Sequence, residues 1–198
     1  MFHLYKQANI EYIILIMRHL FFTILAVSLF LVPNFIRAEE MLLSSVQVEV
    51  ESMHKSAAQA DLVVVEKGAR LMTLFRDHKP IRSYKIALGR SPKGAKLKQG
   101  DRRTPEGFYT IDGRNPKSRY HLSLHISYPN VRDLEIAQLL RVSAGNGIAI
   151  HGVSEDYEWM GRYHASLNWT DGCIAVTNEE IEEIWSLVPD GTEIQIKP

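Results

Sequence analysis

The chain has 198 residues with 23 basic and 23 acidic side chains, so its formal net charge is zero, and it contains a single cysteine. One cysteine excludes an internal disulfide and a multi-cysteine zinc cluster. Between Arg76 and Arg103, ten basic residues occur with only two acidic ones. Apolar strand positions interrupt this stretch, so we interpret it as a solvated face and expect no nucleic-acid partner. Contact with the carboxylates of an anionic polymer is the alternative.

Residues 1–38 have the order of an export signal. The basic residue Arg18 precedes an apolar run at residues 20–32, and a small-residue cleavage pattern ends the segment. These thirteen apolar-leaning residues are fewer than the ~20 that a membrane span needs, although an earlier apolar stretch could extend them to an anchor over residues 10–32. Translation from Met17 would leave a compact signal. We expect an exported protein of the periplasm or cell envelope, with residues 1–38 as a signal peptide or membrane anchor.

The rest of the chain is predicted to form a lead-in and one mainly β domain. Residues 39–60 have no sustained period and are interpreted as a linker, whereas residues 61–198 have the length of one medium domain. Branched and aromatic runs between turn residues predict strands at 62–66, 71–76, 81–88, 108–111, 120–127, 147–150 and 191–196, the first three as a meander. Helical spacing predicts two short helices, at 131–142 and 177–188, the second with the capping pattern Thr177-x-x-Glu180.

The strongest functional signal surrounds the lone cysteine. Cys173 ends the run Trp169-Thr170-Asp171-Gly172-Cys173, and His151-Gly152 stands 22 positions upstream, at the end of a predicted strand. Thiolate is the reactive form of cysteine, and a nearby histidine can supply the base or cation that activates it. The alternative is a small buried apolar thiol, but Thr-Asp-Gly favours a tight, exposed turn. The pattern therefore predicts a cysteine nucleophile with a histidine base.

These residues resemble the signature of the L,D-transpeptidase catalytic domain family, also called the YkuD domain, in its ErfK/YafK type. The resemblance covers residues 61–198, and the matched positions are His151, Gly152, Thr170, Gly172 and Cys173. The chain departs from the family pattern at Asp171, where histidine is usual, and at Ala175. The resemblance implies a mainly β fold with two short helices, arranged as a β-sandwich or a partly open barrel.

The resemblance also implies a reaction. Such enzymes attack a peptidoglycan stem peptide after its diamino acid, release D-alanine and form a thioester, which an amine of a second stem resolves to a cross-link that remodels the cell wall. In these roles Cys173 attacks, His151 moves the proton, and the N–H groups of Gly172 and Cys173 bind the oxyanion. We expect a monomer without cofactor or metal ion, with stem peptides as substrates and a wall-attached protein as a further candidate acceptor or substrate.

Six further residues are predicted to contact the substrate. They are Gly152, Thr170, Asp171, His121, His125 and Tyr163. We expect Asp171 to shape the cysteine turn through hydrogen bonds to its own backbone. The two histidines lie four apart on one predicted strand, hence on one face, where they either line the groove or are simply solvated. The tyrosine lies in the loop between the two catalytic segments and is a candidate lid residue.

Other classes of function stay open. His121, His125, His151 and Cys173 could hold zinc in an amidase, provided that all four converge at tetrahedral distances. A wall-binding module could keep the fold without turnover. Sortases also place histidine before cysteine, but they need an arginine after the cysteine, and none follows Cys173. If water resolves the thioester, the same site is a peptidoglycan peptidase.

Overall fold

The computed structural model describes residues 17–21, 37, 40–50, 53 and 59–198, and the chain divides into two compact units, residues 1–56 and 57–198. In the first unit, residues 40–50 are helical with exposed side chains, in the segment interpreted as a linker. Most of the predicted signal or anchor lies outside the described residues and stays a prediction. Among the described residues, no helix is long and apolar enough to cross a membrane.

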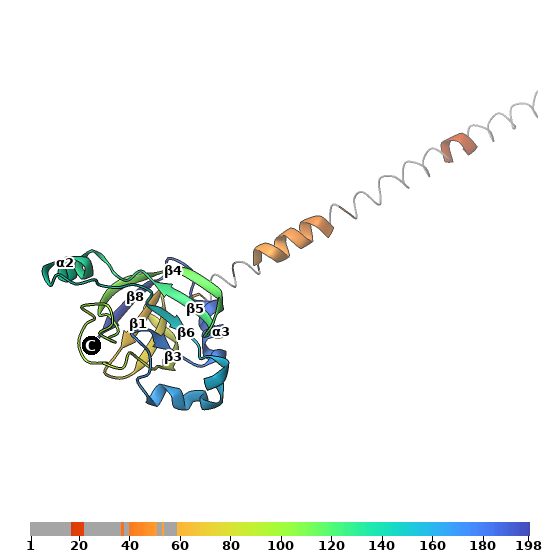
Figure 1. Cartoon of the computed structure of the whole chain (residues 1–198). Helices are drawn as coiled ribbons and strands as arrows, with labels where there is room; N and C mark the ends of the chain where they lie inside the picture. The colour runs from red at the N-terminus through yellow and green to blue at the C-terminus, as the bar shows by residue number, and fades with distance from the viewer. Residues whose placement is uncertain (1–16, 22–36, 38–39, 51–52, 54–58) are drawn as a thin grey trace, which may run out of the picture. The chain divides into compact units, whose positions relative to one another are not determined.

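The second unit is built on one mixed β-sheet of eight strands, in the order β3-β2-β1-β8-β4-β5-β6-β7 (Figure 1). The strands are β1 (Leu62–Glu66), β2 (Leu71–Arg76), β3 (Lys79–Lys85), β4 (Gly107–Ser118), β5 (His121–Ile126), β6 (Ala149–His151), β7 (Ile174–Ala175) and β8 (Glu193–Lys197). All seven predicted strands are present, and the short β7 is the addition. The first three form the predicted antiparallel meander.

The two ends of the strand order are joined by the segment that follows β3. Ala87 forms an antiparallel bridge with Ala175 of β7, and Gly89 forms a parallel bridge with Thr170. The sheet therefore closes on itself as a partly open barrel, which confirms the predicted fold class. The closure also places the segment after β3 directly beside the cysteine turn.

The core fills the inside of this sheet, because each strand turns alternate side chains inward. β8 ends the chain but lies in the middle of the sheet, parallel to β1 and antiparallel to β4. The largest fully buried side chains are Met72, Leu74, Ile86, Leu88, Ile111, Leu124, Ile126, Ile150, Ile174, Ile181, Ile184 and Ile194. They come from β8, from strands on both sides of it, from the segment after β3 and from α3, so the unit has one continuous core.

The two predicted helices differ in how they pack. α3 (Asn178–Leu187) begins at the predicted cap, where the Thr177 and Glu180 side chains each accept a hydrogen bond from the other's backbone N–H, and it packs against β5 and β6. α2 (Val131–Leu139) ends three residues before the predicted end and buries only Ala137. Figure 1 shows α2 projecting from the strands. Its apolar spacing therefore does not mark a face that packs on the core.

A third helical element was not predicted. η1 (Glu155–Ser166) is a 3₁₀ segment in the stretch interpreted as a polar loop, and it is kinked at Gly161, whose φ is 48°. Its acidic and aromatic residues have no apolar period, so the pattern gave no helix signal. For residues 59–198, the expectation of two helices is thereby corrected to two α-helices and one 3₁₀ segment.

Candidate active site

The cysteine turn, residues 170–173, is held by the side chain of Thr170. Its Oγ1 accepts a hydrogen bond from the Gly172 N–H at 3.2 Å and donates one to the Cys173 carbonyl at 2.7 Å. Gly172 has a φ of 135°, and a Cβ there would lie 2.7 Å from the Arg103 carbonyl oxygen. Glycine is the residue that this backbone conformation and this close approach allow.

A second backbone segment presses against the turn. The Arg90 N–H donates to the Thr170 carbonyl at 3.0 Å. Just before it, Gly89 approaches so closely that an added Cβ would lie 2.2 Å from the Arg102 carbonyl oxygen and 3.1 Å from the Gly172 Cα. No role was predicted for Gly89, although an isolated glycine beside a strand signals close backbone approach.

β6 carries His151 into a buried position, where the residue is 3% exposed. Its Nδ1–H donates to the Gly152 carbonyl at 2.6 Å, and because a carbonyl only accepts, Nε2 holds the lone pair. The ring stacks on Tyr120 with centroids 4.5 Å apart and meets Trp169 edge-on at 5.8 Å. Burial lowers the pKa of His151 to about 4, so the imidazole is neutral near neutral pH.

Gly152 lets the start of α3 pack against the histidine strand. A Cβ at Gly152 would lie 2.4 Å from Asn178 Oδ1, the atom that accepts the Val153 N–H at 2.8 Å. The glycine therefore has a packing reason within the fold. Its predicted contact with substrate stays a prediction.

The parallel pairing of β6 and β7 brings the two catalytic segments together. His151 pairs with Ala175, so Cys173, which directly precedes β7, lies at the start of the neighbouring strand. Its Sγ lies 3.6 Å from the Gly147 carbonyl oxygen. Two segments that are 22 residues apart in the sequence thus meet on adjacent strands.

The electrostatics of the pair favour neutral partners. Burial raises the pKa of the Cys173 thiol, and the Asp171 carboxylate adds to the rise, against a hydrogen bond from the Ala149 backbone and the charge of Lys96. With the imidazole also neutral, the resting state is a thiol beside a base rather than a thiolate beside a cation. The neutral histidine can therefore accept a proton.

Asp171 does not form the predicted turn-shaping hydrogen bond, which Thr170 supplies instead. The Asp171 side chain is 76% exposed and accepts a hydrogen bond from Arg90 Nη1 at 3.1 Å, with Arg102 Nε 3.9 Å away. The usual family histidine is thus replaced by a carboxylate that faces the basic segment. Its contact with substrate stays a prediction.

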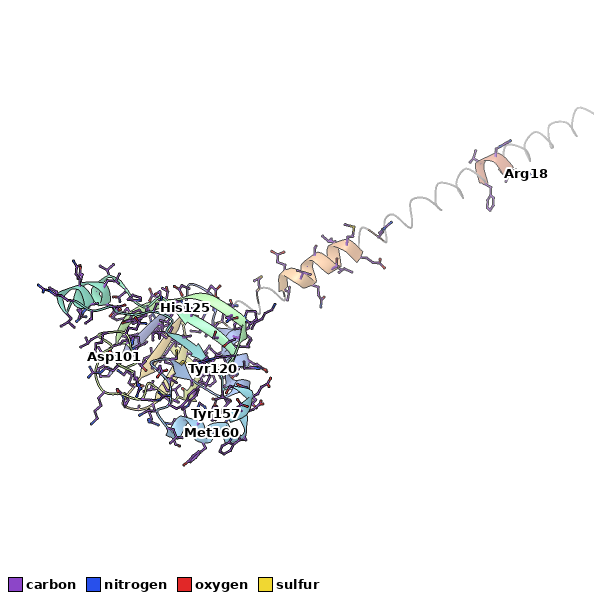
Figure 2. All side chains as sticks on the ribbon, in the orientation of Figure 1. Arg18, Asp101, Tyr120, His125, Tyr157 and Met160 are labelled. Atoms are coloured by element: carbon purple, nitrogen blue, oxygen red, sulfur yellow. The ribbon has the colours of Figure 1, made fainter. Side chains whose placement is uncertain are left out.

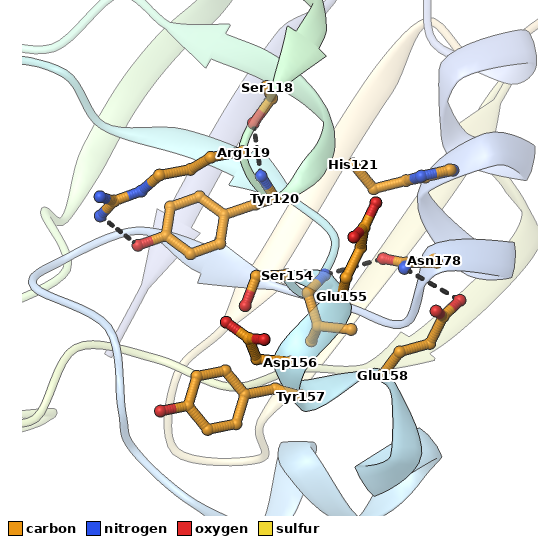
Figure 3. Close-up of a pocket in the computed structure, with 11 residues that line it drawn as sticks. Ser118, Arg119, Tyr120, His121, Ser154, Glu155, Asp156, Tyr157, Glu158 and Asn178 are labelled. Atoms are coloured by element: carbon orange, nitrogen blue, oxygen red, sulfur yellow. Dashed lines mark hydrogen bonds between the residues drawn. The ribbon is translucent and has the colours of Figure 1, made fainter.

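Two hollows flank the catalytic pair. A cleft of about 430 Å³ opens at Cys173, and Lys96, Arg102 and Asp171 contribute to its rim. A cavity of about 900 Å³ lies on the histidine side, where Tyr120, which stacks on His151, forms part of the wall (Figure 3). No role was predicted for Tyr120, because its ring contact with His151 depends on the tertiary structure.

The three remaining predicted substrate residues separate in space. His121 lines the larger cavity, with Nε2 2.7 Å from Glu182 Oε1. His125 lines neither hollow and pairs through Nδ1 with Asp112. Tyr163 is 65% exposed and also lines neither hollow. Figure 2 shows His125 well apart from the Tyr157 side chain of η1.

The zinc arrangement does not fit the structure. His121 and His125 are each paired with a different carboxylate, and His151 donates to a backbone carbonyl. Within the described residues, no group of three or more His, Cys, Asp or Glu side chains is placed to hold a metal ion. The four residues of the amidase hypothesis therefore do not form a tetrahedral site.

Comparison with known proteins decides the family. The model of the L,D-transpeptidase catalytic domain, YkuD, matches residues 60–196. This chain belongs to the YkuD family. The matched region contains the cysteine turn, the histidine strand and both hollows, so the site described above lies wholly inside the family domain.

Individual relatives of this YkuD protein are distant. "Putative L,D-transpeptidase YafK" of Escherichia coli, in strains K12 and O157:H7, is 28% identical over 153 residues, which cover 73% of this chain and 54% of the relative. The chain thus spans about half the length of the curated relatives it matches. Among solved structures, the helical cell shape determining protein Pgp2 from Campylobacter jejuni is similar with a TM-score of 0.54 and 25% identity, over 70% of this chain and 47% of Pgp2.

Proposed function

We propose that this protein is a cysteine-dependent L,D-transpeptidase that acts on peptidoglycan stem peptides through a thioester acyl-enzyme. One observation carries the proposal: Cys173 stands on a glycine-constrained turn beside the strand that ends at the buried, neutral His151. Membership of the YkuD family implies peptidoglycan peptides as the substrate class. The open cleft at Cys173 supplies room for such a peptide.

Acylation follows from the protonation state of the pair. Cys173 Sγ attacks the amide carbonyl after the diamino acid, while Nε2 of His151 takes the thiol proton. The C–N bond to the terminal D-alanine then breaks, and His151 returns the proton to the leaving amine. The carbonyl carbon is left bonded to sulfur as a thioester.

The developing oxyanion needs a backbone donor. The Gly172 N–H already donates to Thr170 Oγ1, whereas the Cys173 N–H has no acceptor among the described residues. We therefore assign the oxyanion contact first to the Cys173 N–H. The Gly172 N–H, also predicted for this role, would have to share its proton with the Thr170 hydroxyl.

The thioester is resolved by a nucleophile whose identity defines the reaction. An amine of a second stem peptide or of a wall-attached protein forms a new amide, breaks the C–S bond and returns a proton to sulfur. Water in the same position forms a free carboxyl group and makes the enzyme a hydrolytic peptidase. Peptidoglycan lies outside the cytoplasmic membrane, so the proposal requires the export that residues 1–38 predict.

Relatives agree with a role in the cell envelope. Pgp2 is a helical cell shape determining protein, and YafK carries the L,D-transpeptidase name. We therefore propose that the protein remodels the wall and influences cell shape. The proposed function is assigned to the family domain, residues 60–196.

The decisive experiment incubates the purified full chain with wall fragments and identifies the products by mass. Release of D-alanine with joined fragments indicates transpeptidation, and its release with free tripeptide ends indicates hydrolysis. A matched Cys173→Ala protein must give neither product. A carbapenem adduct on Cys173 in the wild type separates an enzyme from a wall-binding module, and intact walls without an adduct would reject the proposal.

A further inference from the structure

The cavity on the histidine side combines aromatic and polar side chains on facing walls. One wall is the β4–β5 turn with Arg119 and Tyr120, and the other is the start of η1 with Ser154, Asp156 and Tyr157 (Figure 3). Its volume of about 900 Å³ lies near the top of the ~300–1,000 Å³ range of small-molecule sites. The cavity therefore has room for a ligand larger than one amino-acid side chain.

The η1 wall carries polar groups that the protein itself leaves uncommitted. Ser154 caps η1 without a side-chain hydrogen bond. Within the described residues, the Glu155 and Asp156 carboxylates and the Tyr157 hydroxyl form no hydrogen bond or salt bridge. Groups of this kind are available to donate to or accept from a ligand at little cost in internal contacts.

The opposite wall is preorganised. Arg119 Nη2 donates to the Tyr120 hydroxyl at 2.5 Å, and its guanidinium lies over the Tyr120 ring at 4.6 Å. The same ring stacks on His151 with centroids 4.5 Å apart. A ligand held between the Arg119–Tyr120 pair and Tyr157 would therefore lie against the residue that contacts His151.

We propose that this cavity binds the sugar rings of the peptidoglycan glycan strand. Pyranose rings present C–H groups that pack on aromatic rings, and hydroxyl and acetamido groups that bond to carboxylates, hydroxyls and guanidinium. The walls supply the exposed Tyr157 ring for the first kind of contact, and Asp156, Ser154 and Arg119 for the second. The lining carries three carboxylates with Arg119 and His121, so a cationic peptide is the competing class of ligand that the test must separate from a sugar.

The inference rests on the proposed function, because it assigns the cavity to the sugar part of the same substrate. A glycan in the cavity would hold a stem peptide near His151 and Cys173, and so raise its local concentration at the thiol. The enzyme would then act better on stem peptides that remain attached to sugar than on free ones. The η1 wall would select the substrate, and Cys173 and His151 would carry out the catalytic step.

Binding is measured on the full chain carrying Cys173→Ala, in detergent, by calorimetric titration with chitotetraose as the neutral amino-sugar probe and tri-lysine as the cationic probe. We expect chitotetraose to bind, and Tyr157→Ala to weaken binding by about tenfold or more, the loss that one stacking contact typically causes. Asp156→Asn should weaken it less. Phe108→Ala and Glu135→Gln, an exposed aromatic and an acidic residue outside the cavity, are matched controls that should change nothing.

Absence of chitotetraose binding overturns the inference, as does binding that Tyr157→Ala leaves unchanged. Tri-lysine binding that Asp156→Asn abolishes, without chitotetraose binding, would assign the cavity to cationic peptides instead. The wild-type enzyme is then compared on free and disaccharide-linked stem peptides. If the enzyme turns over both substrates equally, the glycan site is rejected and the proposed transpeptidase activity stands. If it turns over neither substrate, the transpeptidase activity is rejected, and the titration alone tests the sugar site.

Discussion

The two sides of the catalytic pair are built in opposite ways. On the thiol side, close backbone packing and one hydroxyl set the geometry: Thr170 Oγ1 bonds to the Gly172 N–H and the Cys173 carbonyl, and Gly89 presses against Gly172. On the histidine side, aromatic side chains set it, since Tyr120 and Trp169 surround the ring of His151. Cys173 is thus placed by contacts that tolerate almost no added atom, and His151 by contacts that side-chain substitution can tune.

The electrostatic settings of the two sides also differ. The thiol cleft has Lys96 and Arg102 in its lining, whereas the histidine cavity is lined by three carboxylates with Arg119 and His121. Behind Trp169 lies His164, which is 1% exposed, and burial lowers its pKa. We therefore expect substitutions on the thiol side to change the reaction rate and the stability of the fold. We expect substitutions on the histidine side to change proton transfer and ligand binding.

The largest expected effect is at the thiol itself. Cys173→Ala should abolish turnover without changing the unfolding temperature, because the turn is held by Thr170 and Gly172 rather than by the sulfur. Cys173→Ser should be almost as inactive, because a hydroxyl is a much weaker nucleophile near neutral pH. Turnover and thermal unfolding are measured on the same samples. Residual activity near the wild-type level would place the chemistry elsewhere.

The next effect is at the base. His151→Gln should reduce turnover by about 10²- to 10⁴-fold, the range typical of a general acid–base group. Alkylation of Cys173 by iodoacetamide near neutral pH should also slow, since no base then assists the thiol. His125→Gln is the matched control, because His125 lines neither hollow. Equal alkylation rates in wild type and His151→Gln would show that His151 does not act on the thiol.

Gly89 tests the backbone side of the comparison. Gly89→Ala should lower the free energy of unfolding by about 2 kcal/mol or more and reduce activity, because the new Cβ would overlap the Arg102 carbonyl oxygen. Gly68→Ala is the control, since its Cβ would meet its nearest neighbour at an ordinary 3.7 Å. Urea unfolding of both variants decides. A Gly89→Ala protein as stable as the control would mean that the segment after β3 moves freely.

A pH series tests the histidine side. The pKa of His151 is lowered to about 4 in the folded protein, so between the ordinary value of about 6.5 and 4 the unfolded chain binds the additional proton. Stability from this group is present above about pH 6.5 and declines as the pH falls toward 4. The unfolding temperature of His151→Gln should fall less steeply over this window, with the remaining slope including His164, whose pKa is also lowered. Parallel curves would contradict the buried neutral state.

The smallest effect concerns Asp171. Its exposed pairs with Arg90 and Arg102 should contribute only about 0–1 kcal/mol, so Asp171→Asn should leave stability nearly unchanged. Because the carboxylate raises the pKa of Cys173, the neutral variant should have a lower thiol pKa. Its alkylation should therefore be faster at pH values below that pKa. Alkylation rate against pH is the measurement, with Asp190→Asn as an exposed control. Superimposable curves would remove Asp171 from the electrostatics of the thiol.

Features that depend on neighbouring residues could be predicted from the sequence, whereas features that depend on contacts between distant segments could not. The strands were predictable because runs of branched and aromatic residues lie between turn residues, and α3 because Thr177 and Glu180 form a capping box. η1 escaped prediction because its residues have no apolar period. α2 was predicted as a helix, but its exposed Leu134 and Leu139 show that helical spacing alone does not say what a face packs against.

For this protein, the sequence by itself determined the seven main strands, the two α-helices of the family domain and the family signature, because these depend on residue type and short spacing. Only the tertiary structure decided that Gly89 meets Gly172, that Tyr120 covers His151 and that Asp171 faces Arg90. Those contacts join segments far apart in the chain, and the neutral state of the pair follows from burial, which no local pattern encodes.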